Sequence, residues 1–88
     1  MKIIEGFRIR YMIGQAFVVG EGVKQLDFKK LITLNDSAAY LWQCVENKDF
    51  DVPDLATLLM EKYGIDLATA TKDAQTIANK WIEVGVVE

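Results

Sequence analysis

Few residues of this 88-residue chain have the chemistry that catalysis requires. The chain contains no histidine and a single cysteine, Cys44. A serine or cysteine nucleophile needs an adjacent base, and the Ser-His and Cys-His pairs both take it from histidine. The absence of histidine therefore excludes these pairs, His-based metal sites and histidine proton shuttles. Cys44 falls within a predicted helix, where we expect it to act as a small buried hydrophobic residue.

Other arrangements that could hold a metal or a phosphate are equally poor. Asp49, Asp51 and Asp54 could bind a hard cation, but they flank a predicted helix start, where negative charge is stabilising in its own right. Their spacing does not match that of a calcium-binding loop. The segment Gly20-x-Gly22 lacks the helix and lysine of a phosphate-binding loop. We therefore expect no catalytic residue, no metal site and no cofactor, and we interpret the chain as a non-enzyme.

The composition is that of one small folded domain over residues 1–88. Hydrophobic residues make up 51% of the chain and charged residues 26%, and there is one proline. These values exclude disordered and collagen-like chains. No apolar stretch approaches the about 20 residues of a membrane span, and residues 1–6 lack the apolar core of a signal peptide. We expect a cytoplasmic protein with no membrane partner.

The net charge of −3 hides a strong asymmetry along the chain. Residues 1–34 contain six cations and three anions, which gives +3. Residues 35–88 contain four cations and ten anions, which gives −6. The acidic second part disfavours extensive contact with nucleic-acid phosphates.

The first part of the chain has the patterning of strands. Residues 7–12 alternate between apolar and polar side chains, with Tyr11 as the last residue of the apolar face. This period of two predicts a half-buried strand. Residues 15–19 are rich in strand-forming types and predict its partner. Gly14, between the two, can adopt the positive φ that a tight hairpin turn requires.

A third strand is predicted over residues 28–34, and its edge is the most informative feature of the sequence. Lys30 falls on the apolar side, which favours a start of the regular strand at Leu31. A free strand edge beside an apolar helix can accept a peptide as an added strand. Lys29 and Lys30 could attract an acidic peptide or could protect the edge from aggregation. A third interpretation is a structural module whose edges pair with each other in a homodimer.

The periodicity becomes helical after this strand. Asn35 is a good N-cap for a helix over residues 36–47, because its side-chain oxygen can accept a hydrogen bond from the first turn. A second helix over residues 53–63 has proline in its first turn and ends at Gly64, which suits the left-handed C-terminal position.

The third predicted helix spans residues 67–84 and begins after Asp66, which can cap it. Its apolar stripe starts at Leu67 and recurs at spacings of three and four residues. The order of elements thus predicts an α+β fold, in which a three-stranded antiparallel sheet precedes three helices. This arrangement is similar to a winged helix-turn-helix with the sheet placed first.

A winged helix-turn-helix makes DNA binding the main alternative function. A recognition helix presents Lys, Arg, Asn or Gln to bases and phosphates. The third helix offers Lys72, Asn79 and Lys80, but it also carries Asp73 and Glu83. The sequence therefore favours no nucleic-acid partner, and a DNA-binding or regulatory domain stays as the alternative.

One run of residues resembles a known family. Leu34, Asn35, Ala38 and Trp42 form the pattern Leu-Asn-x-x-Ala-x-x-x-Trp, at the junction of the third strand and the first helix. Tyr63-Gly64-Ile65-Asp66 and the closing Gly85-Val86-Val87-Glu88 agree with it. Over about residues 5–88 the sequence resembles the PqqD-like family. These small domains are RiPP recognition elements, which serve ribosomally made, post-translationally modified peptides.

The resemblance implies a winged-helix-like fold without catalytic activity. Family members bind the leader segment of a precursor peptide and present it to a modifying enzyme, often a radical SAM protein. The leader is added to the third strand and lies in a groove against the third helix. Carried over to this chain, the resemblance implies a peptide-binding chaperone, either a monomer or a homodimer.

The same resemblance assigns the docking strand to residues 31–34 and the groove wall to the third helix. Trp81 could instead have a purely structural role in the core. The peptide-binding residues expected in this way are Lys29, Lys30, Leu31, Ile32, Thr33, Leu34, Asp73, Ile77, Lys80, Trp81 and Val84.

Overall fold

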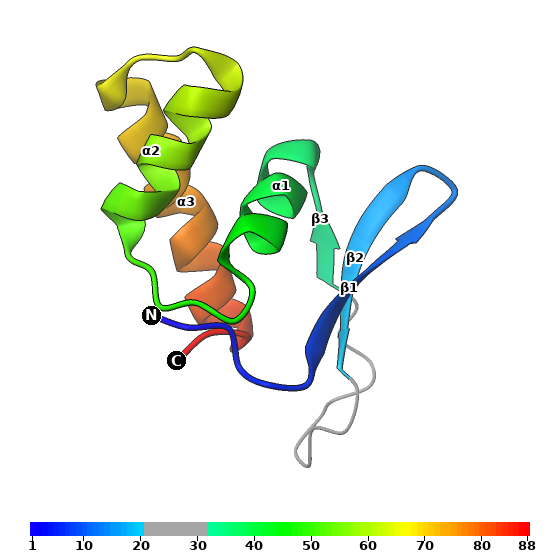
Figure 1. Cartoon of the computed structure of the whole chain (residues 1–88). Helices are drawn as coiled ribbons and strands as arrows, with labels where there is room; N and C mark the ends of the chain where they lie inside the picture. Colours follow the sequence, from blue (N-terminus) through cyan, green and yellow to red (C-terminus); the bar gives the residue numbers. More distant parts are fainter. Residues whose placement is uncertain (21–31) are drawn as a thin grey trace.

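A computed structural model describes residues 1–20 and 32–88 and has the predicted order of elements (Figure 1). The three strands form one antiparallel sheet, and the three helices follow it in the chain. The predicted α+β fold is therefore confirmed. The elements are β1 (Phe7–Met12), β2 (Gln15–Gly20), β3 (Ile32–Leu34), α1 (Asp36–Val45), α2 (Val52–Tyr63) and α3 (Leu67–Val84).

Strands β1 and β2 form a hairpin that projects away from the helices (Figure 1). Their register runs from Phe7 opposite Gly20 to Met12 opposite Gln15, so the connection is a two-residue turn. Ile13 and Gly14 in this turn have φ values of 52° and 71°. Positive φ at both central residues is the geometry of a type I′ turn, whose twist suits a hairpin.

The far end of the hairpin extends past the part of the sheet that α1 covers (Figure 1). Tyr11, expected on the inner face, is therefore 58% exposed, although its hydroxyl accepts a hydrogen bond from Gln43 of α1. Phe7 and Ile9, nearer the helices, pack against the core as predicted. On β1 the contact with the core thus ends before Tyr11, whereas Ala16, opposite Tyr11 on β2, is buried.

Strand β3 lies at the edge of the sheet, in the order β1-β2-β3. Thr33 lies opposite Phe17 of β2, and it is exposed while Ile32 and Leu34 are buried. The third strand was expected over residues 28–34. Its expected first part, which includes Lys29, Lys30 and Leu31, lies outside the described residues.

Each helix start is capped by a short polar side chain. In α1 the Asn35 side-chain oxygen accepts a hydrogen bond of 2.8 Å from the Ala38 amide, as predicted. At α2 the Asp51 amide donates to the Asp54 carboxylate at 2.9 Å, and Asp54 thereby helps to cap the helix. Helix α1 ends at Val45, short of the expected residue 47, because Glu46 and Asn47 leave the helical conformation.

Helix α3 differs from expectation only at its beginning. Leu67, expected to start the buried stripe, is 64% exposed, and burial begins with Ala70. The α2–α3 connection lies at the end of the molecule farthest from the sheet, so the first turn of α3 has little to pack against (Figure 1).

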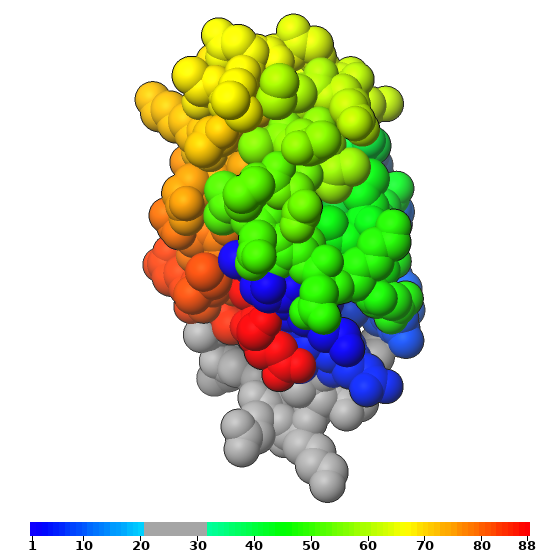
Figure 2. All heavy atoms as spheres, turned by 60° about the vertical axis from the view of Figure 1, so that its left-hand side comes forward, coloured from blue at the N-terminus to red at the C-terminus, as the bar shows by residue number. Residues whose placement is uncertain are grey.

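The core draws on every element and on both terminal segments. Ile3 pairs with Val87 in an antiparallel bridge, and the ends of the chain lie side by side (Figures 1 and 2). Val86 is fully buried beside them. The largest fully buried side chains are Trp42, Trp81, Leu41, Leu55, Leu59, Val18 and Val86. Within residues 1–20 and 32–88, no helix combines the length and apolarity that crossing a membrane would need.

Candidate functional site

A groove lies between the edge strand β3 and helix α3, with a cavity of about 150 Å³. Its lining comes from three parts of the chain: β3, the first turn of α1 and the second half of α3. Because β3 leads directly into α1, the capping bond of Asn35 holds the strand and the helix start in one fixed geometry. The lining residues are Ile32, Thr33, Leu34, Asn35, Ala38, Thr76, Ile77, Lys80 and Trp81.

The periodicity of the strand and that of the helix place the side chains that line the groove. Ile32 and Leu34 point to the helical side of the sheet, while Thr33, between them, points outward. Ile77, Lys80 and Trp81 are spaced by three and four residues, so they share one face of α3. The strand and the helix thereby form the two walls of one groove.

The groove is apolar at its base and cationic at its rim. Trp81 is 1% exposed and Leu34 6%, whereas Ile77 is half-buried and open to a ligand. Lys80 is exposed and contributes a positive charge beside this apolar surface. A volume of about 150 Å³ is below the about 300–1,000 Å³ typical of small-molecule sites. The groove therefore suits an apolar side chain of a peptide better than a metabolite.

The structure brings together six of the residues that were expected to bind peptide: Ile32, Thr33, Leu34, Ile77, Lys80 and Trp81. Asp73 and Val84, also expected, do not line the groove. Asp73 is exposed one turn earlier on α3, and Val84 packs against the core at the other end of the helix. The remaining expected residues, Lys29, Lys30 and Leu31, lie outside the described residues.

Three groove residues were not predicted from the sequence: Asn35, Ala38 and Thr76. Asn35 and Ala38 belong to the Leu-Asn-x-x-Ala-x-x-x-Trp pattern, so a signal for them was present. The pattern was used to identify the family resemblance, and Asn35 was interpreted as a helix cap, but neither residue was assigned to the groove. Thr76 precedes Ile77 and has no sequence signal of its own.

Trp81 has a structural role as well as a place in the groove. Its ring lies edge to face with those of Trp42 and Phe50, at centroid distances of 5.4 and 6.0 Å. At 1% exposure it offers a ligand only a small part of its surface. The base of the groove is therefore the outer surface of the core.

Two of the three clustered acids near the start of α2, Asp51 and Asp54, have structural partners. Asp51 accepts a hydrogen bond from the N-terminal amine of Met1 at 3.3 Å, and Asp54 helps to cap α2. In the part of the chain that the structure describes, no group of three or more His, Cys, Asp or Glu residues is placed to hold a metal ion.

Two pKa values are shifted by hydrogen bonds at positions away from the groove. A hydrogen bond with Cys44, assisted by burial, raises the pKa of Tyr40. Hydrogen bonds from the side chain and the backbone amide of Thr69 lower the pKa of Asp66. Neither Tyr40 nor Asp66 lines the groove, so binding there does not depend on these two groups directly.

The family model of coenzyme PQQ synthesis protein D (PqqD) matches residues 22–87, about three quarters of the chain. This chain belongs to the PqqD family. The match includes β3 and all three helices, and therefore every described part of the groove. It begins after the β1–β2 hairpin, so the match is narrower than the expected resemblance over residues 5–88.

The fold of this PqqD family member is also similar to a solved structure of TbiB1 in complex with the TbiA(beta) leader peptide. The TM-score is 0.76, and the match covers 100% of this chain and 95% of that chain. The sequences are 14% identical, so the likeness concerns the fold. No match was found among curated proteins.

Proposed function

We propose that this PqqD family member is a peptide-binding accessory protein. It captures the leader segment of a ribosomally made precursor peptide by strand addition at β3 and presents it to a modifying enzyme. The observation that carries the proposal is the position of β3, an edge strand that forms one wall of an apolar groove. Such an edge supplies affinity through backbone hydrogen bonds, and the groove supplies selectivity through side chains.

The backbone of β3 is suited to this role. Within residues 1–20 and 32–88, no strand pairs with its outer edge. Along an antiparallel strand, the N–H and C=O groups of alternate residues point to the same side. Either Thr33 or its two neighbours, Ile32 and Leu34, therefore direct hydrogen-bonding groups to the outer edge. An extended peptide can pair with those groups without any rearrangement of the sheet.

The groove supports the same partner through its chemistry. Every second side chain of an added strand faces the helical side, where Ile77 and Leu34 offer apolar contact. Lys80 at the rim favours a carboxylate on the same peptide. A free leader segment loses conformational entropy when it becomes ordered, and the buried apolar contacts must outweigh that loss. The favoured ligand is thus an extended peptide with an apolar anchor and a nearby acidic residue.

The TbiB1 structure, which contains a leader peptide, supports a peptide ligand over the alternative of a DNA-binding domain. The exposed residues of α3 also give little support to DNA binding, since Lys72 and Lys80 are accompanied by Asp73 and Glu83. We propose that the chain has no catalytic activity of its own. The modifying enzyme, in this proposal a radical SAM protein, supplies the chemistry in the cytoplasm, where the precursor is made.

The test is selection of a peptide ligand followed by mapping of its site. A display library of random linear peptides is screened against the intact protein, and the enriched peptide is titrated into the labelled protein by NMR. The largest amide shifts are expected at residues 32–34 and 76–81. A random DNA duplex, titrated at low salt where phosphate contacts are strongest, serves as the comparison.

The proposal is rejected if no peptide is enriched, or if the shifts fall on another surface. It is also rejected if the duplex binds more tightly than the selected peptide. Peptide-induced shifts at β3 and α3 without duplex binding would support it.

A further inference from the structure

The polar side chains of the groove beside β3 are rich in hydrogen-bond donors. They belong to Thr33, Asn35, Thr76 and Lys80, and no carboxylate of the described residues lines the groove. The Thr76 hydroxyl donates to the Lys72 carbonyl oxygen at 3.0 Å, so it is used within its own helix. In the part of the chain that the structure describes, nothing accepts a hydrogen bond from the other three side chains. A ligand that supplies acceptors would complete them.

Asn35 has the most fixed geometry of these donors. Its side-chain oxygen accepts the 2.8 Å capping hydrogen bond from the Ala38 amide. The oxygen and the NH₂ group of a carboxamide share one plane, so the cap also orients the Nδ2 donors. Capping alone would be served equally well by aspartate or serine. Neither has an NH₂ group, so asparagine adds donors that the cap does not use.

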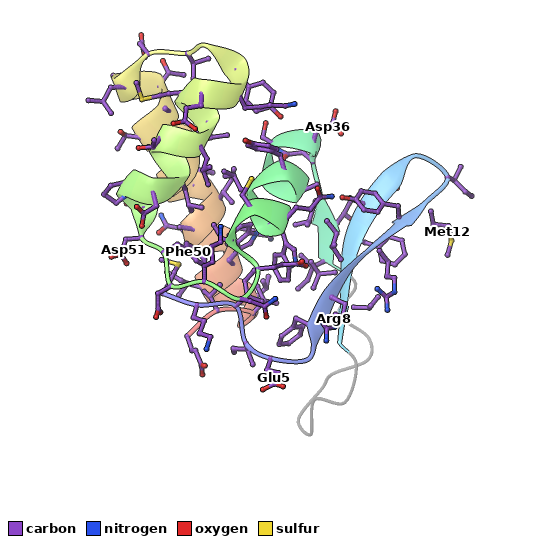
Figure 3. The ribbon with its side chains drawn as sticks, viewed as in Figure 1. Glu5, Arg8, Met12, Asp36, Phe50 and Asp51 are labelled. Atoms are coloured by element: carbon purple, nitrogen blue, oxygen red, sulfur yellow. The ribbon has the colours of Figure 1, made fainter. Side chains whose placement is uncertain are left out.

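Lys80 contributes a positive charge from the other wall of the same groove. It is exposed, and no ion pair in residues 1–20 and 32–88 involves it. Asp36, which follows Asn35, does not line the groove, and its exposed side chain lies at the start of α1 (Figure 3). The ammonium group and the carboxamide are therefore both available to a carboxylate from outside.

The position of Asn35 relative to β3 adds a second argument. Its φ of −73° and ψ of 174° are those of an extended backbone, so it continues the line of the strand by one residue. Strand β3 has only three residues, and so few backbone hydrogen bonds specify poorly which part of a peptide pairs with it. A slip by one residue would turn every peptide side chain to the opposite face. A polar anchor at the end of the strand would prevent that slip.

We propose that the Asn35 carboxamide and the Lys80 ammonium group bind the carboxylate of an aspartate or glutamate side chain, which sets the register of the leader peptide on β3. The carboxylate accepts hydrogen bonds from Asn35 Nδ2 and from Lys80 Nζ, and the charge strengthens both. An apolar side chain of the same peptide contacts Ile77. This inference rests on the proposed function, because only an added strand needs a register.

Selection from a library of random linear peptides is the first test. Enriched peptides should have an acidic residue at a constant spacing from an apolar one. They are then synthesised with an amidated C-terminus, so that only side chains supply carboxylates. Moving the acidic residue by one position should lower the affinity at least about tenfold, because neighbouring side chains of a strand point to opposite faces.

The outcomes separate this inference from the proposed function. Peptides that bind at β3 and α3 without a preference for an acidic residue would overturn the carboxylate subsite and leave the proposed function intact. Failure to enrich any peptide would reject both.

The variant Asn35→Asp separates the donors from the cap. It retains a capping oxygen and nearly the same size, but it replaces the NH₂ group by a second acceptor. The urea midpoint should stay at the wild-type value. The affinity for the acidic peptide should fall at least about tenfold, whereas a peptide with glutamine or asparagine in place of the acid should change less than about threefold. Equal losses for the two peptides would contradict a contact between Asn35 and the carboxylate.

The variant Lys80→Gln tests the charge, and Lys72→Gln is its matched control. Lys72 is exposed on the same helix about two turns earlier and does not line the groove. Isothermal titration calorimetry should show at least about a fivefold loss of affinity for Lys80→Gln and less than about a twofold loss for Lys72→Gln. Similar losses for both would mean that the peptide responds to the overall charge of α3, and the subsite would be rejected.

Discussion

The indole rings of Trp42 in α1 and Trp81 in α3 meet edge to face, with centroids 5.4 Å apart and an interplanar angle of 84°. Both side chains are almost fully buried, and Phe50 packs against Trp81 in the same manner. Trp81 also lines the groove beside β3. The contact that joins the two helices therefore also supports the base of the proposed peptide site.

Replacement of Trp81 should accordingly be a stability mutation before it is a binding mutation. We expect Trp81→Ala to lower the free energy of unfolding by about 3–5 kcal/mol, because it leaves a large cavity beside Trp42. Trp81→Phe should cost less, since it retains part of the ring contact. Urea denaturation followed by circular dichroism measures both. A loss below about 1 kcal/mol for Trp81→Ala would show that the aromatic cluster is not central to the core.

The groove wall can be tested with two isoleucines of the same helix. Ile77 is half-buried in the groove, whereas Ile82 is 56% exposed and lies outside it. Ile77→Asp should weaken binding of the selected peptide at least about tenfold, because it places a charge in an apolar contact. Ile82→Asp should leave the affinity within about twofold, as is usual for a surface change. Isothermal titration calorimetry measures the peptide affinity of those variants that keep the circular dichroism spectrum of the wild type. Equal effects of the two changes would show that the Ile77 face of α3 does not contact the peptide.

Strand addition makes a specific prediction for backbone amides in β3. Amides that point to the outer edge should exchange with solvent quickly in the free protein, and those paired with β2 slowly. Along Ile32, Thr33 and Leu34 the fast and slow amides should alternate. The selected peptide should protect the fast ones, as measured by hydrogen–deuterium exchange with NMR detection. If the peptide binds at α3 but leaves the exchange of the β3 amides unchanged, it occupies the groove without forming an added strand.

The cap of α3 should make stability depend on pH. Hydrogen bonds from Thr69 lower the pKa of Asp66 in the folded protein, so the ionised carboxylate stabilises the fold. That contribution is present above the unfolded-state pKa of about 3.9 and is lost as pH falls through the lower folded-state value.

Asp66→Asn retains a capping oxygen but does not titrate. The stability advantage of the wild type over Asp66→Asn should therefore decrease when the pH is lowered from about 6 to about 3. Urea denaturation at a series of pH values measures it. A pH-independent difference between the two proteins would mean that the cap does not favour the charged form.

Relief of the strain at Ile13 should stabilise the fold. Ile13→Asn should raise the free energy of unfolding by about 1 kcal/mol, because asparagine tolerates positive φ far better than a β-branched residue. Gly14→Ala should have the opposite effect through its φ of 71° alone, since open space surrounds the position. Thermal unfolding measures both. A destabilising Ile13→Asn would show that the isoleucine has a structural role in the turn.

Local signals in the sequence predict most of the fold. Alternation over residues 7–12, the glycine at position 14 and the caps at Asn35 and Asp66 all specify short-range geometry, and each occurs in the structure. These features depend on the chemistry of neighbouring residues, so the sequence contains the information directly. The first helix was predicted to reach residue 47. It ends at Val45 instead, because Asn47 adopts a positive φ, which asparagine tolerates and an α-helix does not contain.

Local signals in the sequence do not determine which residues form the groove. The spacing of Ile77, Lys80 and Trp81 shows that they share a helix face, but not which of them reach β3. Asp73 and Val84 lie on neighbouring turns of α3 and were also expected in the groove, which spans only about one and a half turns. Thr76 enters it only because of how α3 is rotated and where it crosses the strand.

The sequence by itself thus determined the order of elements, their caps and turns, the charge asymmetry and the membership of the PqqD-like family. The tertiary structure decided that Leu67 and Tyr11 are exposed, that Trp81 belongs mainly to the core, and that Asn35 and Lys80 line one groove. The reason is physical: a turn or a cap depends on bonds between neighbours, whereas exposure and grooves depend on how far one packed element extends past another.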